Sequence, residues 1–245
     1  MAIDQFSRTR LVYGYEGVDA LQQARVAVFG LGGVGGFVAE SLVRSGLGAI
    51  DIIDKDVVSL TNLNRQVIAT QDTIGRPKTE VMAERLALIN PACRVTTHHC
   101  FYLPATADEF DLSSYDYLVD AVDTVTAKLA LIERAQRTHT PIISSMGAGN
   151  KTDPTAIRIA DITKTSVCPL ARIIRKELRR RGLAPIKVGY SIEPPRTPAT
   201  LAPEDTELPD EGRRSVPGSN AFVPSAMGLA IGAEVMRDLI ALAQR

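Results

Sequence analysis

Short apolar runs rich in β-branched residues alternate with longer segments in which apolar side chains recur at helical spacing. The short runs are typical of buried strands, and we expect strands at residues 25–30, 49–54, 94–100, 117–123 and 141–149. The longer segments predict helices at residues 33–45, 77–90 and 126–139. Because strands that alternate with helices form βαβ units, the pattern indicates an α/β fold with a doubly wound, mostly parallel, Rossmann-like sheet.

The pattern changes after about residue 150. It predicts strands at residues 156–162 and 186–194 and helices at residues 169–181 and 222–243. In the last of these helices, we expect Leu229, Val235 and Leu239 to pack on the sheet. Residues 195–219 are rich in Pro, Glu, Asp, Arg and Ser, a composition typical of a mobile loop.

Composition excludes several protein classes. The chain has 245 residues, a length suited to one domain, and its 28 Lys and Arg residues balance 28 Asp and Glu residues. Cys93, Cys100 and Cys168 show no C-x-x-C spacing, so neither a disulfide framework nor a four-cysteine zinc site is expected, and a reducing cytoplasm fits best. The apolar run at residues 221–233 is too short to span a membrane, and the N-terminal residues lack a signal-peptide core.

The stretch VFGLGGVG at residues 28–35 fits the G-x-G-x-x-G template of a loop that presents backbone amides to a phosphate. Its glycines are Gly30, Gly32, Gly33 and Gly35. Asp54 ends the second expected strand, where an acid binds ribose hydroxyls. Up to this point, NAD and ATP fit the pattern equally well.

A group of polar and basic residues beyond the second strand distinguishes the two ligands. Asn62, Arg65 and Lys78 follow Asp54, and a dinucleotide site relies mainly on amides and a helix dipole rather than on such cations. A triphosphate carries more charge, and Arg, Lys and Mg²⁺ stabilise a leaving pyrophosphate. Taken singly, Asn62 could cap a helix and Arg65 could form a surface ion pair. Together with Lys78, they favour ATP.

The ordered motifs GLGGVG, IDKDVVSLTNLNRQ, GRPKTEVMAERLALINP and DAVDT resemble the superfamily of ThiF, MoeB and the ubiquitin-activating enzymes, over residues 6–149. These families adenylate carboxylates with ATP. The resemblance implies that ATP and Mg²⁺ are the cofactors and that Asp123 holds the metal. The ATP site that it implies consists of Gly30, Gly32, Gly33, Gly35, Asp54, Asp56, Asn62, Arg65, Gln66, Lys78, Asp123 and Lys128, the last of these in the place of a basic residue that follows the aspartate.

The same resemblance implies a homodimer in which an N-terminal arginine reaches the ATP site of the partner subunit. The segment FSRTR offers Arg8 as the first candidate and Arg10 as the second. The residues implied in catalysis are therefore Arg8, Asn62, Arg65, Lys78 and Asp123. We divide the single domain into an N-terminal arm or helix (1–24), a nucleotide-binding core (25–150) and a substrate-side extension (151–245).

The second half, with DITKTSVCPLARIIRKELRRRG and VGYSIEPP, resembles the branch of tRNA threonylcarbamoyladenosine dehydratases and extends the resemblance over nearly the whole chain. Members of this branch use ATP to activate the threonyl carboxylate of a modified adenosine beside the anticodon, which then cyclises with net loss of water. The closure is intramolecular, so no cysteine nucleophile is required. We therefore interpret Cys168 as a packed residue rather than a nucleophile, and we read His98 and His99, for which the sequence shows no obvious partner, as structural.

A tRNA substrate calls for a basic surface. On the helix at residues 169–181, Leu170, Ile173, Ile174 and Leu178 would face the core. The cations would then face outward, and we expect tRNA contacts at Arg172, Arg175, Lys176, Arg179, Arg180 and Arg181, although a charge run is often only a solvated face.

Two other functions stay open at this point. One is an adenylyltransferase for the C-terminal glycine of a ubiquitin-like sulfur carrier, against which the missing zinc cysteines count. The other is a nucleotide-dependent oxidoreductase or a pure nucleotide-binding module, in which Arg65 and Lys78 would be incidental. The sequence also leaves open a sulfur-relay protein as a partner and an alkali metal in the site.

Overall fold

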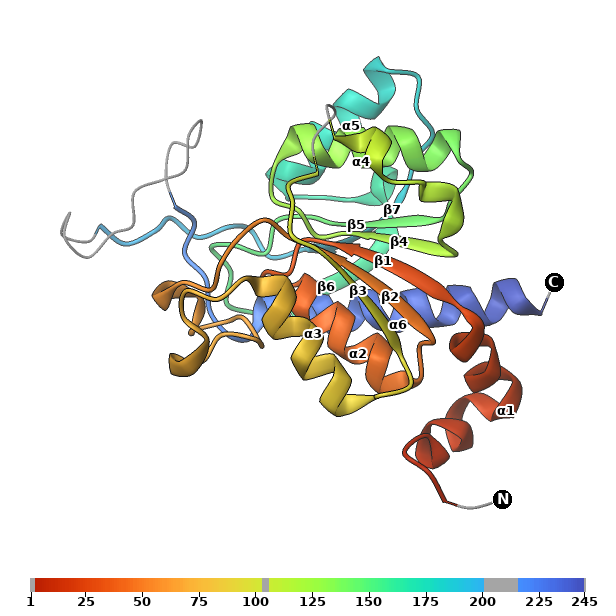
Figure 1. Ribbon diagram of the computed structural model, residues 1–245. Helices are drawn as coiled ribbons and strands as arrows, with labels where there is room; N and C mark the ends of the chain where they lie inside the picture. Colours follow the sequence, from red (N-terminus) through yellow and green to blue (C-terminus); the bar gives the residue numbers. More distant parts are fainter. Residues whose placement is uncertain (1–2, 103–105, 201–215, 245) are drawn as a thin grey trace.

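The fold is built on one twisted sheet, which a computed structural model describes together with its helices over residues 3–102, 106–200 and 216–244. Within these residues, the strands lie in the order β3-β2-β1-β4-β5-β7-β6 (Figure 1). They are β1 (Arg25–Phe29), β2 (Ala49–Ile53), β3 (Arg94–His98), β4 (Tyr117–Asp120), β5 (Ile142–Ser145), β6 (Ile157–Asp161) and β7 (Lys187–Ser191). All pairings are parallel except that of β6 with β7, so the expected mostly parallel α/β fold is confirmed.

Helices cover both faces of the sheet. They are α1 (Ser7–Gln23), α2 (Gly35–Ser45), α3 (Lys78–Ile89), α4 (Val125–Arg137), α5 (Pro169–Arg180) and α6 (Val223–Ala243). Figure 1 shows α4 and α5 on one face and α2, α3 and α6 on the other, with α1 beside the end of α6. Short 3₁₀ turns lie at Leu60–Asn62, Gln71–Thr73, Ala107–Glu109, Leu112–Ser114, Pro154–Ala156 and Ile162–Lys164.

The alternation of side chains along each strand divides the core into two layers. In β1, Val26 and Val28 pack with α2, α3 and α6, whereas Ala27 and Phe29 pack with α4 and α5 on the opposite face. All four side chains are fully buried. The continuous apolar runs in the sequence therefore reflect strands that are covered on both faces.

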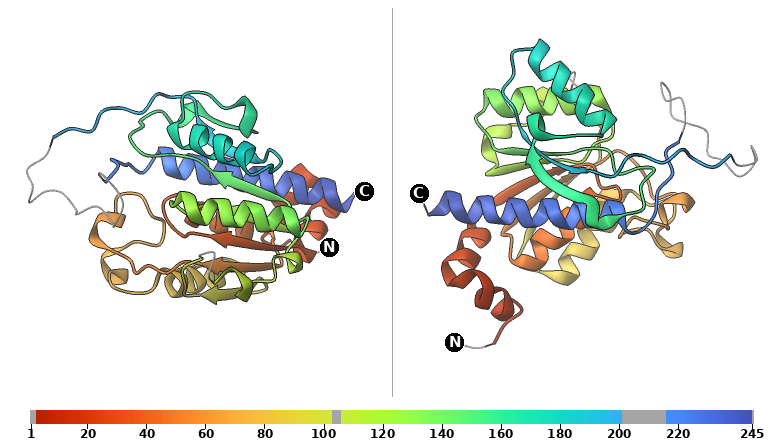
Figure 2. Two further views of the ribbon diagram at one scale, coloured as in Figure 1. Left: turned by 90° about the horizontal axis from the view of Figure 1, so that it is seen from above. Right: turned by 180° about the vertical axis from the view of Figure 1, so that it is seen from behind.

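The C-terminal helix α6 packs differently from the expectation. Val235 and Leu239 are buried as expected, but Leu229 is 50% exposed. Instead, Gly228 and Gly232 face α2, where an added Cβ would lie 2.4 Å from the Val34 carbonyl oxygen and 2.2 Å from Ser41 Oγ. This close approach of two helices turns Leu229 outward, and Figure 2 shows α6 running alongside the sheet.

Several expected strands end early for a reason that concerns function. The strand expected at residues 117–123 ends at Asp120, and the one expected at residues 141–149 ends at Ser145. Of the residues that follow, Ala121, Val122, Asp123, Ala148 and Gly149 line a cleft, as described below. Residues 195–200 and 216–219 of the expected mobile loop are irregular, and residues 201–215 lie outside the described part of the chain.

Among the described residues, we find no helix with the length and apolar character needed to cross a membrane.

Candidate active site

A cleft of about 790 Å³ opens at the carboxyl ends of the central strands, where open α/β sheets bind ligands. Its volume lies within the range of small-molecule sites. The loops that form it gather at the left of Figure 1, away from the C-terminal end of α6. Ten of the residues expected at an ATP site line it, namely Gly30, Gly32, Gly33, Asp54, Asp56, Asn62, Arg65, Gln66, Lys78 and Asp123.

The glycine loop owes its shape to close backbone contacts. Gly30 has a φ of 92°, and an added Cβ would lie 2.6 Å from the Ala121 carbonyl oxygen. A Cβ on Gly35 would lie 1.7 Å from the Gly30 carbonyl oxygen, so Gly35 allows α2 to start against the loop but does not line the cleft. Gly32 has no atom within 4 Å of an added Cβ and leaves its side of the loop open to a ligand.

Asp54 connects the loop to the strand that follows it. Its Oδ2 accepts a hydrogen bond of 2.6 Å from the Leu31 amide, and its Oδ1 accepts one of 2.8 Å from the Asp56 amide. The carboxylate is therefore held in one orientation at the cleft wall. Each oxygen has a second lone pair with which it can accept a hydroxyl donor such as a ribose.

The basic residues of the cleft are also held by protein groups. Lys78, at the start of α3, has a nearly buried side chain whose Nζ lies 2.9 Å from Asp56 Oδ2. Arg65 Nη1 donates hydrogen bonds to the Thr61 carbonyl oxygen and to Asn64 Oδ1, both at 2.9 Å. Two cations in a cleft with a helix start suit a polyanionic ligand.

Asn62 belongs to a capping box and also lines the cleft. The N-cap of this 3₁₀ turn is Ser59, and Asn62 is the third residue of the turn. Its Oδ1 accepts a hydrogen bond of 3.2 Å from the Ser59 amide, so Asn62 supports the start of the turn without being its cap.

Gln66 is buried, and its Oε1 has no hydrogen-bond partner in the described part of the chain. A buried acceptor without a partner is costly unless a ligand or water supplies a donor. Its position in the cleft lining indicates that a bound ligand can supply one.

Asp123 is exposed at the cleft and lies just before α4. No group of three or more His, Cys, Asp or Glu side chains that could hold a metal occurs in the described residues. Mg²⁺ is commonly bound through one or two carboxylates together with substrate phosphates and water. A single cleft carboxylate such as Asp123 fits that mode and does not fit a metal held by protein alone.

Lys128 does not reach the cleft. It is 1% exposed, and its Nζ lies 3.2 Å from both carboxylate oxygens of Asp120 and 2.7 Å from the Ser145 carbonyl oxygen. Lys128 lies in the second turn of α4, whose buried face points to β4 and β5. The expected ATP contact is therefore replaced by a buried ion pair beneath the cleft.

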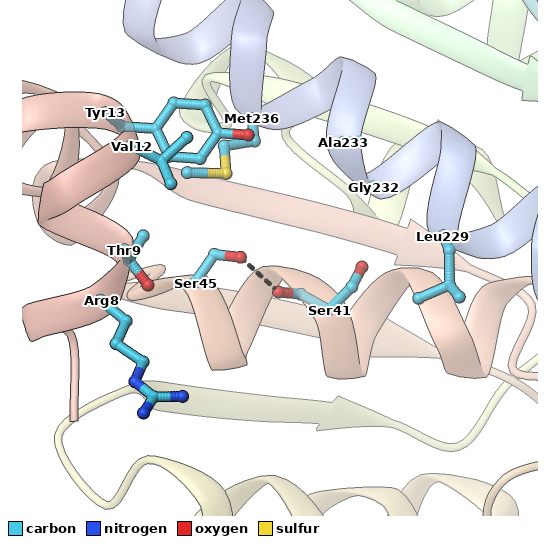
Figure 3. A pocket seen from close by; sticks show the side chains of 10 residues that line it. All are labelled: Arg8, Thr9, Val12, Tyr13, Ser41, Ser45, Leu229, Gly232, Ala233 and Met236. Atoms are coloured by element: carbon cyan, nitrogen blue, oxygen red, sulfur yellow. Dashed lines mark hydrogen bonds between the residues drawn. The ribbon is translucent and has the colours of Figure 1, made fainter.

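The N-terminal arginines lie away from this cleft. Arg8 belongs to a separate hollow of about 360 Å³ between α1, α2 and α6, and no residue lines both cavities. Figure 3 shows its side chain pointing away from Tyr13 and Met236. Arg10 forms an ion pair of 2.6 Å with Asp4 and lies over the Tyr15 ring, whereas the Arg8 side chain forms neither a hydrogen bond nor an ion pair with any described residue.

The cations of α5 fall into two groups. Arg172, Lys176 and Arg179 are exposed and form no ion pair with the residues described here. Arg180 pairs with Glu177, and Arg181 pairs with Glu133.

Two expectations about α5 are wrong. Arg175 turns back and donates to Thr165 Oγ1 at 2.6 Å, so it does not face outward. Ile173 is 46% exposed instead of facing the core, where Ala171 takes its place beside Ile174 and Leu178.

A histidine also has a partner that the sequence did not reveal. His98 Nε2 lies 2.9 Å from Asp51 Oδ2, and Arg25 and Tyr115 bind the same buried carboxylate. This cluster is structural because none of its members lines the cleft. Cys168 is buried at the start of α5, as a packed residue would be.

Sequence reasoning missed part of the cleft wall. Val216, Pro217 and Ser219, which shortly precede α6, line it, and Lys55 lies over the Phe101 ring in the same wall. The signal available was the Pro and Gly pair at residues 217–218, which punctuates the chain before α6 but does not reveal a partner far away in sequence.

Comparison with known proteins agrees with this geometry. The model of the ThiF family matches residues 6–242, which is almost the whole chain. The chain belongs to the ThiF family. Within the family, it is 43% identical over 242 residues to the tRNA threonylcarbamoyladenosine dehydratase of Bacillus subtilis, covering 97% of this chain and 95% of the relative.

Solved structures of the same branch of the ThiF family are similar throughout. The E. coli tRNA N6-threonylcarbamoyladenosine dehydratase TcdA in complex with ATP superposes with a TM-score of 0.86 at 34% identity, covering 98% of this chain and 96% of that one. The AMP complex of the same enzyme gives a TM-score of 0.87 at the same identity and coverage. The ThiF fold and the dehydratase branch are therefore shown for this chain.

Proposed function

We propose that this chain is an ATP-dependent tRNA threonylcarbamoyladenosine dehydratase. The observation that carries the proposal is the cleft, in which a glycine loop, Asp54, Arg65, Lys78 and Asp123 meet at the carboxyl ends of parallel strands. The likeness to an ATP complex of a dehydratase supports the same reading. The substrate is the threonyl carboxylate of a threonylcarbamoyladenosine beside the tRNA anticodon.

The reaction has two steps. In the first, a carboxylate oxygen attacks the α-phosphorus of ATP, the bond to the β-phosphate oxygen breaks, and pyrophosphate leaves with the electron pair. In the second, the carbamoyl oxygen attacks the activated acyl carbon, the bond to the AMP oxygen breaks, and a carbamoyl N–H proton is released. The nucleoside loses one water overall, because its carboxylate oxygen leaves within AMP. The attacking oxygen belongs to the same molecule, so high effective molarity supports the second step.

We infer roles for the cleft residues from their chemistry. Asp54 accepts from the ribose hydroxyls, the amides at Gly32 and Gly33 approach the phosphates, and Asn62 and Gln66 complete the polar wall. Arg65 and Lys78 stabilise the charge that develops on pyrophosphate. Asp123 would hold Mg²⁺, which would supply positive charge to neutralise the phosphates when it is bound.

We further propose a homodimer in which Arg8 completes the partner subunit's ATP site. Leu11 and Val12 on α1 are 87% and 73% exposed, which is a costly arrangement for an isolated chain and suits a second copy. The hollow that contains Arg8 and the ATP cleft of the same chain have no lining residue in common. Arg8 would therefore contact ATP in a second copy of the chain. Arg10 is already paired with Asp4, which favours Arg8 for this role.

Mixing two inactive variants tests this arrangement. R8A lacks the arginine, and K78A lacks the cleft lysine. In a mixed dimer, the R8A subunit has an intact cleft, and the K78A subunit supplies an intact Arg8 to it. Random mixing should restore about a quarter of the activity of the unmodified dimer, since half of the dimers are mixed and each has one competent site of two. No recovery in verified mixed dimers would rule out the trans role, and R10A in place of R8A tests Arg10.

We propose that tRNA contacts the stripe of Arg172, Lys176 and Arg179 on α5. These residues follow one another at helical spacing of four and three positions and therefore share a face. Changing all three to Gln should weaken tRNA binding and reduce the salt slope by about 3, if each contacts one phosphate. Changing Arg180 and Arg181 is the matched control, because their charges are already paired. If both sets of substitutions weaken tRNA binding equally, the stripe is not the tRNA contact.

The decisive experiment is mass spectrometry of nucleosides from modified tRNA incubated with the purified chain, Mg²⁺ and ATP. We expect ATP-dependent loss of one water from threonylcarbamoyladenosine with formation of AMP, and no product without ATP. The reaction as written consumes only ATP and tRNA, so a sulfur-relay protein should not be required for turnover. An unchanged nucleoside, with AMP formed only when a ubiquitin-like carrier is added, would instead favour the adenylyltransferase alternative.

A further inference from the structure

Part of the cleft lining comes from residues 216–220, here called the edge segment. Val216, Pro217 and Ser219 from this segment line the cleft together with the glycine loop and Arg65. The segment joins no strand or helix before α6 begins at Val223. Its position therefore depends on individual hydrogen bonds to neighbouring loops.

Asn150 holds one side of the edge segment. The Gly218 amide donates to Asn150 Oδ1 at 2.7 Å, and the Asn150 amide donates to the Gly218 carbonyl oxygen at 2.8 Å. The Arg196 amide donates to the Asn150 carbonyl oxygen at 2.7 Å. One residue thus ties together two segments that flank residues 201–215 in the sequence.

The backbone at this joint is specialised. Asn150 has a φ of 59°, a left-handed conformation that asparagine adopts more readily than most residues. Beside it, a Cβ on Gly149 would lie 2.9 Å from Pro217 Cβ, so the edge segment packs directly on the loop that follows β5. The left-handed backbone of Asn150 and the close approach of Gly149 to Pro217 both support the contact between this loop and the edge segment. The hydrogen bond at Asn150 is therefore part of a specialised joint.

Asn64 holds the other side of the edge segment and also binds an ATP-site residue. Its Nδ2 donates to the Ser219 carbonyl oxygen at 3.2 Å, and its Oδ1 accepts from Arg65 Nη1 at 2.9 Å. The side-chain amide therefore uses its donor on the edge segment and its acceptor on the guanidinium. A shift of Ser219 would move the acceptor that orients Arg65.

We propose that Asn150 and Asn64 are positioning residues, which act through the edge segment to hold the Arg65 guanidinium where it meets the triphosphate of ATP. The inference rests on the proposed function, because it assigns Arg65 to ATP. Neither asparagine is required to touch the nucleotide. The contacts form a series from Asn150 to Gly218 and Ser219, then to Asn64, and finally to Arg65.

Three substitutions at Asn150 separate backbone strain from the hydrogen bond. N150G keeps the left-handed backbone and removes the side-chain acceptor, so the Kd for ATP should rise about two- to tenfold, the range for loss of one hydrogen bond. N150D keeps an oxygen for the Gly218 amide and should stay near the unmodified affinity. N150A adds backbone strain and should be the weakest of the three.

The matched control is T152V. Thr152 lies in the same loop, but its hydroxyl bonds to Glu193 and not to the edge segment. T152V should leave ATP affinity unchanged although it also removes one hydrogen bond. ATP binding is measured by calorimetry well below the unfolding temperature of each variant, so a loss of stability alone would not move the Kd.

A double-mutant cycle with N64A tests the series. If the contacts act in series, N64A already removes the link between the edge segment and Arg65, and adding N150G should raise the Kd no further. If the two residues act independently, the fold-changes should multiply, since distant independent sites are additive in free energy. If the fold-changes in Kd of the two single variants multiply in the double variant, the contacts do not act in series. If the Kd of N150G equals that of the unmodified chain, Asn150 has no positioning role.

The same titrations distinguish failure of this inference from failure of the proposed function. An unmodified chain that binds no ATP would overturn both. An unmodified chain that binds ATP and dehydrates the nucleoside, with N150G equal to it in affinity and turnover, would overturn the positioning role alone.

Discussion

The buried ion pair of Lys128 and Asp120 gives the sharpest test of how this site is built. Substitution of Lys128 by Met keeps most of the side-chain volume and removes the ammonium. Asp120 is completely buried, and its carboxylate would lose two contacts of 3.2 Å, while the Ser145 carbonyl oxygen would lose a donor at 2.7 Å. Asp120 would keep hydrogen bonds from the Ser144 hydroxyl and the Val122 amide, but its buried charge would have no counter-charge.

The expected cost follows from that burial. Breaking a buried ion pair by removing one partner typically costs about 3 to 5 kcal/mol. For a chain of this size, about 2 to 4 °C per kcal/mol gives a fall in Tm of about 6 to 20 °C. R137M is the control, because Arg137 lies on the same helix and its ion pair with Glu133 is exposed. Its cost should stay within about 1 kcal/mol.

Thermal and urea unfolding would measure these changes, with ATP binding followed at low temperature. Because Lys128 does not line the cleft, folded K128M should still bind ATP. The double variant D120N/K128M should recover part of the lost stability, since neither charge then stays unpaired. Unchanged stability combined with lost ATP affinity would refute this reasoning and return Lys128 to the nucleotide site.

Three further predictions concern the cleft and the core. G35A should abolish the folded loop, because its Cβ would lie 1.7 Å from the Gly30 carbonyl oxygen. G32A, whose Cβ would have nothing within 4 Å, should keep the Tm of the unmodified chain. An equal fall in Tm for the two variants would contradict this. ATP should slow alkylation of Cys100, which lines the cleft. Cys93 should stay unmodified at pH 8, because burial raises its pKa to about 11. Peptide mass mapping that shows unchanged labelling of Cys100 with ATP, or labelled Cys93, would contradict these expectations. Burial opposes ionisation of Asp51, but hydrogen bonds from Arg25, His98 and Tyr115 outweigh it and hold the pKa of its carboxyl below the usual range. The stability that ionised Asp51 provides is therefore fully present above about pH 4 and lost as the pH falls through its lowered pKa, so the stability difference from D51N in urea unfolding should narrow in acid; a constant difference would exclude this linkage.

Most of the sheet could be predicted because it is covered on both faces. Val26 and Phe29 point to opposite faces of β1 and are equally buried, so the strand reads as one apolar run. The strand ends were less predictable, since apolar Ala121 and Val122 continue the run of β4 but line the cleft. The pattern of apolar residues indicates which side chains avoid water, but it does not distinguish a residue within a strand from one in the wall of a cleft.

The cleft residues that were predictable lie in local motifs. Gly30, Asp54 and Lys78 follow directly from a strand end or a helix start, where topology alone brings them to one edge of the sheet. Lys128 shows the limit of this reasoning. Its place in α4 follows from the pattern, but the direction of its side chain depends on the helix face. The family resemblance implied a ligand contact, whereas the side chain points to Asp120.

Contacts between distant segments could not be predicted. The bond from Asn64 to Ser219 spans 155 positions, and that from Asn150 to Gly218 spans 68. Neither asparagine belongs to a periodic pattern, and both look like ordinary loop residues in the sequence. The exposure of Leu229 has the same origin, because it depends on how closely Gly228 lets α6 approach α2.

In the proposed function, two sets of cations in this chain meet different partners. In the cleft, Lys78 is held by Asp56 and Arg65 by Asn64, so their side chains are ordered before a nucleotide arrives and little ordering entropy is lost on binding. On α5, Arg172, Lys176 and Arg179 have no such partners among the described residues and can adapt to the phosphates of a tRNA backbone. An ordered site suits a small ligand whose α-phosphorus must meet one carboxylate oxygen, whereas an adaptable stripe suits a large polyanion that need only be held nearby. Salt should therefore weaken tRNA binding much more steeply than ATP binding, because the exposed stripe is screened and the nearly buried Lys78 is not.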